Sequence, residues 1–454
     1  MLDSDGRLLE PKLFNWRTCG ASPTLTSSAK VAAAARPATA ASSKARPRAA
    51  ATLGKLSELT ADSDWPMVVE TLETFGVKVT GGAEDPAGSS LVAVRPFEPG
   101  DEILREAPLA SVRFDEPWSA LEVALTSQFQ LSKIAPAYRL LARMLESDGS
   151  SLLRGEFVQS MAANMEVAES AWNQRFCAFL ADAVNEGEGE PRTSAAMVTK
   201  LLAILKTNAF GLYEVGEAGL SSVGLGLYPL VALANHECDP SAVWSFEGEQ
   251  IVLRAVRTLR PGEAVTDAYV LPREPPASRQ QKLRESYRFD CACARCVREA
   301  ADAPKLSKLA AEFRTARAAL EGRIGLEGVT GTGGAGYAGE EDMEDMVLLK
   351  RCTKLLGKLT PPADCHPDTA VLRLKLGSLW WRLYERGQQA ESARGGAAAK
   401  FPIANGCLQQ ATEHWKHARE MVVVSLGSSH ELLATIDEKL GRASKHQPPG
   451  RDAR

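Results

Sequence analysis

Three cysteines stand close together in the stretch YRFDCACARC, residues 287–296, although the whole chain of 454 residues holds only nine. Cys291, Cys293 and Cys296 form a C-x-C-x-x-C pattern, and thiolates clustered in this way can bind a metal ion. Cys238, upstream of them, offers a fourth thiol. Four thiolates around one zinc ion leave no position for water, so such a site is structural rather than catalytic. We therefore expect these four cysteines to hold one zinc ion.

Two other interpretations of the cysteines stay open on the sequence alone. In the first interpretation, His236 replaces Cys238 as the fourth ligand. In the second, the cysteines bind no metal and are simply buried or free thiols. C-x-C-x-x-C is not a standard zinc-finger spacing, although clustered thiols in a reducing compartment favour metal ligation or redox chemistry over disulfides.

The elements that must position these residues are β-strands with Pro-Gly turns. AVRPFEPGDEIL (93–104) and AVRTLRPGEAVT (255–266) share the order strand, Pro-Gly, acidic residue, strand, which indicates two similar hairpins in one β-rich domain. Because Pro-Gly turns are common, chance similarity of two ordinary hairpins is the alternative.

Helical periodicity dominates two other parts of the chain. Apolar residues recur every three or four positions from Trp118 to Lys206, which predicts a helical insertion in the β domain. From Pro304 onward the pattern is helical again, interrupted by the glycine-rich stretch GVTGTGGAGYAGEEDMED. Ser428 and Glu431 have the spacing of a capping box at the start of the last helix.

Composition narrows the class of protein. At 44% hydrophobic and 24% charged residues, the chain is long enough for two or more globular units, and its longest nearly apolar run, GLGLYPLVALA, is too short to cross a bilayer. The segment from Pro11 to Ser57 holds eight Lys or Arg, no Asp or Glu, and long Ala/Ser/Pro stretches, which predicts disorder. Organelle targeting is the alternative for this tail, and the acidic residues Asp3, Asp5 and Glu10 weigh against it.

Three motifs together resemble a known family. GLYPLVALANHECDPSAVW, LRAVRTLRPGEAVTDAY and YRFDCACARC, in this order, are similar to the SET-domain protein-lysine methyltransferases of the SET-and-MYND (SMYD) type. The opening hairpin AVRPFEPGDEILREAPLA and the segment TNAF at 207–210 also resemble that family. The likeness is strongest over 204–298, extends to 88–114, and is weaker in the helical C-terminal region.

The resemblance implies an α+β fold class, with a β-rich SET domain split by a helical insertion, a zinc-bearing post-SET segment and a helical, TPR-like C-terminal domain. It also implies the domain boundaries. These are a disordered tail at 1–57, a SET domain at 58–285 with the insertion at 118–206, a post-SET segment at 286–300, and a helical domain at 301–445 with a flexible loop at 327–345.

The implied activity is methyl transfer from S-adenosylmethionine to the side-chain amine of a lysine in a protein substrate. Positioning of a neutral amine is the main task, and a narrow aromatic channel favours loss of its proton by desolvation. The family's functional positions fall on the following residues: Tyr269 as the catalytic residue, Tyr269 and Tyr287 in the substrate channel, and Asn208, Asn235, His236 and Phe289 as cofactor contacts.

The chain departs from the family pattern at several positions. Between Pro108 and Asn208 it has one cysteine, Cys177, and no histidine, so no MYND zinc finger is expected there. Glu237 and Ser241 stand where the family usually has Ser and Asn. Ser89 and Ser90 follow Gly88 where a Gly-x-Gly pattern is common.

These departures keep a second function open, namely a catalytically inactive SET-fold scaffold that binds protein partners. A nucleic-acid-binding zinc protein is a third class, but the chain lacks a clustered basic stripe outside its tail. We expect a monomer in the cytoplasm or nucleus, with a histone or another protein as substrate, no membrane association and no direct nucleic-acid binding.

Overall fold

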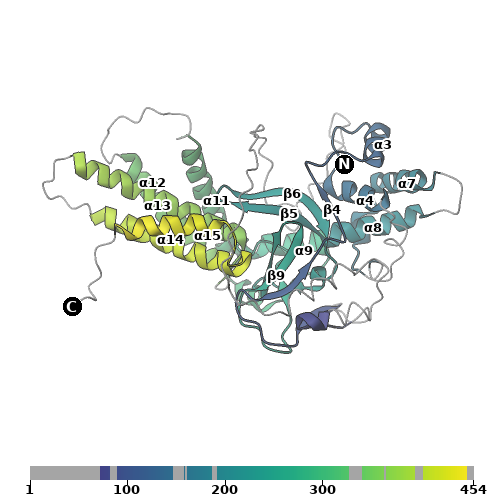
Figure 1. Cartoon of the computed structure of the whole chain (residues 1–454), viewed down its shortest axis with the longest axis horizontal. Coiled ribbons are helices and arrows are strands. Elements are labelled where there is room, and N and C mark those ends of the chain that lie inside the picture. The colour runs from purple at the N-terminus through teal and green to yellow at the C-terminus, as the bar shows by residue number, and fades with distance from the viewer. Residues whose placement is uncertain are drawn as a thin grey trace, which may run out of the picture.

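The computed structural model describes residues 72–81, 89–146, 158, 161–186, 192–326, 340–361, 364–393 and 402–446. The predicted disordered tail at 1–57 and Gly88 lie outside the described residues. The strands lie between two helical regions, with the insertion on one side and the C-terminal helices on the other (Figure 1). This mixed architecture confirms the α+β fold class.

The strands of the described residues form four small sheets. Three of these sheets are antiparallel, and the fourth is a short parallel pair. In sheet order the strands are β1 (Val77–Thr80) and β2 (Ser90–Ala93); β3 (Glu102–Glu106), β9 (Gln250–Ala255) and β8 (Ala242–Glu247); β4 (Ala110–Arg113), β6 (Gly219–Leu227) and β5 (Ala209–Gly216); and β10 (Thr266–Asp267) with β7 (Asn235–His236).

The two similar Pro-Gly hairpins lie against each other. Phe97 of the first and Leu259 of the second exchange both backbone hydrogen bonds, at 3.0 and 2.9 Å. Each turn glycine, Gly100 or Gly262, has a φ of +90° and donates its N–H at 2.8 Å to the carbonyl of the first residue of the other hairpin. A left-handed φ favours glycine, which explains the Pro-Gly pair in both copies. The sequence similarity therefore corresponds to a reciprocal packing of the two copies.

The helical insertion has its own core. Its four long helices bury a continuous apolar cluster that also takes in residues of β4, β5 and β6. Glu122 is fully buried and is paired with Arg139 at 2.6 Å and with Arg143 at 3.1 Å. The helices are α3 (Ala120–Phe129), α4 (Pro136–Glu146), α7 (Ala171–Asn185) and α8 (Ala195–Asn208), and the last of them leads directly into β5.

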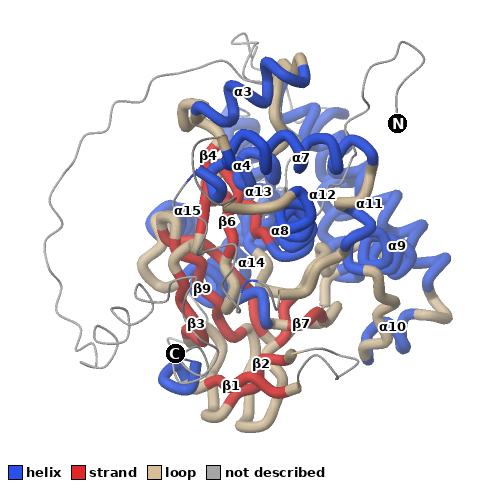
Figure 2. Tube along the Cα trace, turned by 90° about the vertical axis from the view of Figure 1, so that its right-hand side faces the viewer, coloured by secondary structure: helices blue, strands red, loops and turns tan. Residues whose placement is uncertain are grey.

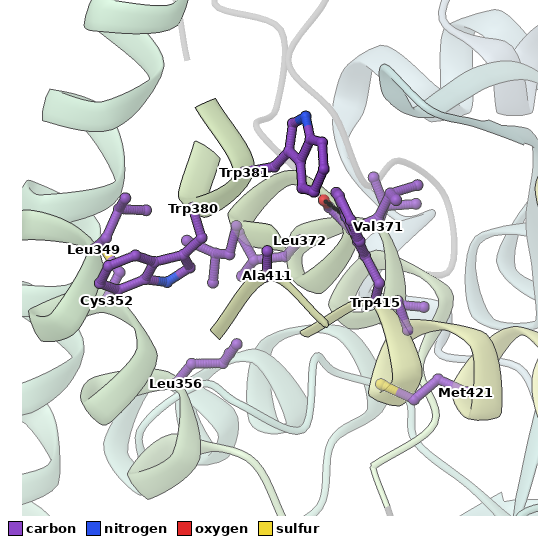
Figure 3. Packing of buried hydrophobic residues seen from close by; sticks show 14 of the residues in the cluster. Leu349, Cys352, Leu356, Val371, Leu372, Trp380, Trp381, Ala411, Trp415 and Met421 are labelled. Atoms are coloured by element: carbon purple, nitrogen blue, oxygen red, sulfur yellow. Dashed lines mark hydrogen bonds between the residues drawn. The ribbon is translucent and has the colours of Figure 1, made fainter. Parts of the chain in front are cut away.

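In the described residues, five helices follow the cysteine-bearing segment and pack around tryptophans. Trp380, Trp381 and Trp415 are buried between helices (Figure 3). The indole of Trp415 packs against Gly377, where a side chain would collide with it. The helices are α11 (Ala303–Leu326), α12 (Glu340–Leu359), α13 (Pro367–Ala393), α14 (Pro402–Leu426) and α15 (Leu432–Ser444).

Two details of the C-terminal region differ from expectation. Helix α12 begins at Glu340, inside the range expected to be a flexible loop, whose residues 327–339 lie outside the described residues. The predicted capping box is wrong, because α15 begins at Leu432 and Glu431 makes no side-chain cap. His430 Nδ1 accepts from the Leu432 N–H at 3.2 Å instead.

Candidate active site and metal centre

The parallel pair β7–β10 brings together two segments of the candidate site. Asn235 pairs with Thr266 and His236 with Asp267, so the chain after β10 carries Tyr269 past the imidazole of His236. The Tyr269 N–H donates to His236 Nδ1 at 2.9 Å. Strand β7 also lies beside β2 (Figure 2), so three separate parts of the sequence meet here.

Asn235 is held by Ser89 and Ser90, the two serines that follow Gly88 where the family commonly has a Gly-x-Gly pattern. Its amide Nδ2 donates to the Ser89 carbonyl at 3.1 Å and to Ser90 Oγ at 2.7 Å. With both amide hydrogens committed, Oδ1 is the group that this partly buried side chain offers to a ligand. An oxygen acceptor suits a positively charged α-amino group, so the site fits the methionine end of the expected cofactor.

Three aromatic rings gather around the imidazole of His236. Tyr269 and Phe289 lie 5.3 and 6.0 Å from the imidazole by ring centroids, and Tyr287 lies 4.6 Å from Tyr269. Tyr287 ends α9 (Pro276–Tyr287), and Arg288 then turns the chain with a φ of +62°, which directs Phe289 back toward the site. All four rings are partly buried. The residues expected from the sequence to line the site therefore lie together.

The Tyr269–Tyr287 pair is closer than an open channel requires. An alkyl chain between two ring faces needs a separation of about 7–8 Å, twice the carbon–carbon contact distance. The centroids are 4.6 Å apart and the ring planes are inclined at 43°. A lysine side chain would therefore pass along the ring edges, or the Tyr287 ring would turn aside.

Asn208 is the expected cofactor contact whose side chain is most enclosed. It is 7% exposed, and its Nδ2 donates to the carbonyls of Ala162 and Ile204 at 2.7 and 2.9 Å. Asn164 connects this region to the aromatic group, because its N–H donates to Thr207 Oγ1 and its amide donates to the Ser286 carbonyl. The end of α8 thus lies near Tyr287, while the Asn208 amide group is hydrogen-bonded to backbone carbonyls of the protein itself.

The two departures beside Asn235 are accommodated by hydrogen bonds. Ser241 is fully buried, and its hydroxyl accepts from the Thr266 N–H at 2.8 Å and donates to the Ala264 carbonyl at 3.2 Å. Thr266 Oγ1 donates to the Glu237 carboxylate at 3.1 Å. Burial raises the pKa of Glu237. Both residues therefore stabilise the contact between β7 and β10.

The four predicted cysteine ligands come together in one group. The Sγ atoms of Cys238, Cys291, Cys293 and Cys296 all lie within 4.8 Å of one another, and no disulfide joins them. Zn–S bonds of about 2.3 Å in a tetrahedron place sulfurs about 3.8 Å apart. The Cys238 sulfur lies 3.5 Å from that of Cys296 and 3.9 Å from that of Cys291. The sulfur spacing fits a tetrahedral metal ion.

Two of the four thiols lose protons more easily than isolated cysteines, whereas the pKa values of the other two, Cys238 and Cys291, are raised within the group. Hydrogen bonds from the thiols of Cys238 and Cys291 to its sulfur lower the pKa of Cys296 to about 6. Hydrogen bonds from the neighbouring thiols, chiefly that of Cys238, also lower the pKa of Cys293. Thiolates are the form in which cysteines bind metal ions. Among the described residues, this is the one cluster of metal-ligating side chains.

Two buried arginines surround the thiols, and the motif analysis missed both. Arg279 is fully buried, lies 3.9 Å from Cys296 Sγ and is paired with Glu299 at 2.6 Å. Arg295 donates to the carbonyls of Cys238, Pro272 and Leu359 at 2.8, 2.7 and 3.2 Å. Arg295 thereby joins the loop of Cys238, the segment after Tyr269 and the end of α12. Arg295 stands inside the C-x-C-x-x-C motif, where α10 (Ala294–Glu299) begins. This position between the cysteines was the one signal in the sequence that could have revealed its role.

Glu106 is a third residue that the motifs did not reveal. Its carboxylate accepts from the N–H groups of Leu230 and Val231 at 3.0 and 2.9 Å, at the start of the short helical turn η2 (Val231–Leu233). That turn leads directly to Asn235. Glu106 therefore fixes the approach of the chain to the site.

None of the helices in the described ranges combines the length and apolar composition needed to cross a membrane.

Comparison with known proteins finds lysine methyltransferases. Over 95 residues, 21% of this chain, it is 38% identical to the histone-lysine N-methyltransferase SMYD3 of Homo sapiens, of which the match covers 22%. Over 128 residues it is 32% identical to human N-lysine methyltransferase SMYD2, covering 26% of this chain and 29% of that protein. Over 84 residues it is 37% identical to histone-lysine N-methyltransferase ASHR1 of Arabidopsis thaliana, covering 18% of each. These matches span less than a third of each relative.

No protein-family model matches the chain. Among solved structures, the SET domain of LSMT bound to lysine and AdoHcy aligns over 89% of this chain and 94% of that chain, with 12% identity and a TM-score of 0.31. Rubisco LSMT bound to AdoMet aligns over 88% and 94%, with 14% identity and a TM-score of 0.29. These scores are too low to support an argument. The sequence matches nevertheless confirm the resemblance to SMYD-type lysine methyltransferases that the motifs indicated.

Proposed function

We propose that this protein transfers a methyl group from S-adenosylmethionine to the side-chain amine of a lysine in a protein substrate. The observation that carries the proposal is the meeting of Asn235, His236 and Tyr269 at the β7–β10 pair. The similarity to SMYD3, SMYD2 and ASHR1 supports the same reaction class.

Tyr269 would orient the amine. Its hydroxyl donates to the Ala234 carbonyl at 2.9 Å, so toward an incoming amine its oxygen acts as an acceptor. An acceptor that binds one N–H of a neutral amine directs the nitrogen lone pair, which is the positioning that this reaction needs. S-adenosylmethionine, when bound, supplies the methyl group from its sulfonium. The nearby rings of Tyr287 and Phe289 exclude water and favour the neutral amine.

Asn235 and Phe289 would hold the cofactor from two sides. The Asn235 amide oxygen is oriented by the serines that bind its nitrogen, and it would accept from the α-ammonium group. Phe289 offers a partly buried ring for the adenine. The Asn208 amide is already bonded to backbone carbonyls, so its proposed role is to hold the wall of the site.

The cysteine group would hold one zinc ion as a structural centre. Four thiolates leave no ligand position for water, so the ion would take no part in the transfer. It would fasten the segment that carries Tyr287 and Phe289 to the loop that carries Asn235 and His236. Metal binding would also contribute directly to folding.

The inactive scaffold is the second candidate, and it was favoured by the departure of Gly88-Ser89-Ser90 from the family's Gly-x-Gly pattern. That argument weakens because Ser90 Oγ binds the Asn235 amide, so the serine serves the same site. The decisive experiment incubates the purified protein with S-adenosylmethionine carrying a radiolabelled methyl group, against histones and a whole-cell lysate. We expect labelled protein bands that weaken with Tyr269→Phe. Cofactor binding without any labelled band would favour the scaffold.

A further inference from the structure

We propose that the imidazole of His236 is a positioning residue that connects the cysteine group to Tyr269. This inference rests on the proposed function and extends it to a side chain so far considered only as a neighbour of the cofactor. His236 Nδ1 lies 2.9 Å from the Tyr269 nitrogen, and Nε2 lies 3.3 Å from Cys238 Sγ. One ring therefore touches a metal ligand at one edge and the catalytic segment at the other.

The backbone contact determines which nitrogen of His236 carries the proton. An N–H of the main chain can only donate, so Nδ1 accepts and bears no hydrogen. The ring is then neutral and carries its proton on Nε2, which is the nitrogen beside Cys238 Sγ. The contact with the sulfur is consequently an N–H···S hydrogen bond in which His236 donates.

This hydrogen bond acts on a proposed metal ligand. A donor to a metal-bound thiolate stabilises its negative charge and fixes its direction, and such outer contacts commonly change metal affinity 10- to 100-fold. On the other side, Tyr269 is held at two points, its nitrogen by His236 and its hydroxyl by the Ala234 carbonyl. A shift of Cys238 would therefore move the imidazole and, with it, the phenol.

Two substitutions separate the two contacts. His236→Asn places an amide oxygen near the position of Nδ1, so it keeps the acceptor for Tyr269 and loses the donor to Cys238. His236→Gln places an amide nitrogen near the position of Nε2, so it keeps the donor to the sulfur and loses the acceptor. The two variants have similar polarity, and each is the control for the other.

The first measurement is the rate at which the zinc-loaded full chain releases zinc to a colorimetric chelator. We expect release about 10-fold faster from His236→Asn and close to the wild-type rate from His236→Gln. The second is methyl-transfer kinetics, in which His236→Gln lowers kcat more than it raises the KM for S-adenosylmethionine. Equal zinc release from both variants and the wild type would overturn the role toward the metal. Equal kinetics in the two variants would overturn the role toward Tyr269.

A third measurement reads the unmodified chain and is independent of activity. With 15N-histidine labelling, the imidazole nitrogen shifts of the six histidines report their tautomers by NMR. We expect His236, assigned by the resonance missing from His236→Gln or His236→Asn, to carry its proton on Nε2. A proton on Nδ1 or a doubly protonated ring would overturn the inference. If no methyl transfer is detected at all, the proposed function fails, and zinc release and the tautomer still decide this proposal.

Discussion

Glu106 on β3 binds the backbone of Val231, the first residue of the turn that leads to the Asn235 loop, with 2.9 Å between Oε2 and the nitrogen. The carboxylate is 6% exposed, and burial raises its pKa to about 8. No ion pair with a basic residue is found for it in the described residues. A buried acid is thus used here as a backbone acceptor that shapes the site.

The raised pKa of Glu106 predicts how stability depends on pH. Between the ordinary pKa of 4.5 and about 8, the carboxyl ionises in the unfolded chain and stays protonated in the folded one. The contribution of Glu106 to stability is therefore present below pH 4.5 and is lost as the pH rises toward 8. We expect Glu106→Gln to reduce the dependence of the unfolding free energy on pH, as measured by urea denaturation between pH 5 and 8. A Glu106→Leu control leaves two backbone N–H groups unpaired, at a cost of about 1–3 kcal/mol each. Identical pH profiles for the wild type and Glu106→Gln would contradict the assignment.

Ser90 and Asn235 should both affect cofactor binding, by different amounts. Asn235→Ala removes the proposed contact, and Ser90→Ala removes only the acceptor that orients it. A net hydrogen bond is worth about 0.5–1.5 kcal/mol, so Ser90→Ala should weaken binding of S-adenosylmethionine roughly 2- to 10-fold. Asn235→Ala should weaken it further in the same titration calorimetry. Ser221→Ala, on the partly exposed part of β6, serves as the control. Wild-type affinity in Asn235→Ala would remove that side chain from the site.

Tyr269→Phe should separate turnover from binding. The ring is kept while the amine acceptor and the bond to Ala234 are lost, so affinity for S-adenosylmethionine should stay near the wild-type value. Loss of one transition-state hydrogen bond of about 1–1.5 kcal/mol lowers kcat about 10-fold. The number of methyl groups added, read by mass spectrometry, should also change. Unchanged rate and product pattern would rule out the proposed role of the hydroxyl.

Cys293→Ser should disrupt the metal centre and, through it, the cofactor site. We expect about one zinc per chain in the wild type, by the ligand count of a four-thiolate site, and clearly less in the variant by elemental analysis. The melting temperature should fall by about 2–4 °C for each kcal/mol of stability lost, and cofactor affinity should fall with it. Cys365→Ser, outside the cysteine group, should keep its zinc. Full zinc content and normal affinity in Cys293→Ser would mean that these cysteines do not hold zinc.

Arg279 should slow the loss of metal. Four thiolates around a divalent ion carry excess negative charge, and the buried guanidinium lies 3.9 Å from Cys296 Sγ. Arg279→Met keeps most of the volume and removes the charge, so zinc release to a chelator should be faster than in the wild type. Arg284→Met, at an exposed position of the same helix, is the matched control. Equal rates for the two variants would show that Arg279 supports only the packing of α9.

The sequence predicted the parts of the site whose residues are close along the chain. Cys291, Cys293 and Cys296 lie within six positions, and their spacing alone indicated a common ligand. The fold class was implied by the family resemblance, while hydrophobic periodicity and the Pro-Gly turns indicated only its helical and β-rich parts. The capping box failed because α15 begins at Leu432, so Glu431 stands at the N-cap rather than three residues into the helix. His430 Nδ1 accepts the Leu432 N–H there.

The parts that sequence analysis missed depend on distant contacts. Ser90 is 145 residues from Asn235, and Glu106 is 125 residues from Val231. Ser90 was noted only as a departure from the Gly-x-Gly pattern, with no partner assigned to it, and nothing next to Glu106 along the chain distinguishes that residue. Only the folded backbone brings them to the loop that they support.

The reciprocal packing of the two Pro-Gly hairpins has a consequence for folding kinetics. Each hairpin completes its hydrogen bonds on the other, and most of the chain between β3 and β9 is synthesised before the second hairpin exists. This long loop must close, at a cost in entropy, before the contact can stabilise the chain, and contacts of high sequence separation form slowly. The helical insertion can fold earlier on its own apolar core, whereas the loop of Asn235 must wait for the second hairpin. A chain stopped before residue 255 would therefore carry the insertion in folded form and still lack a cofactor site.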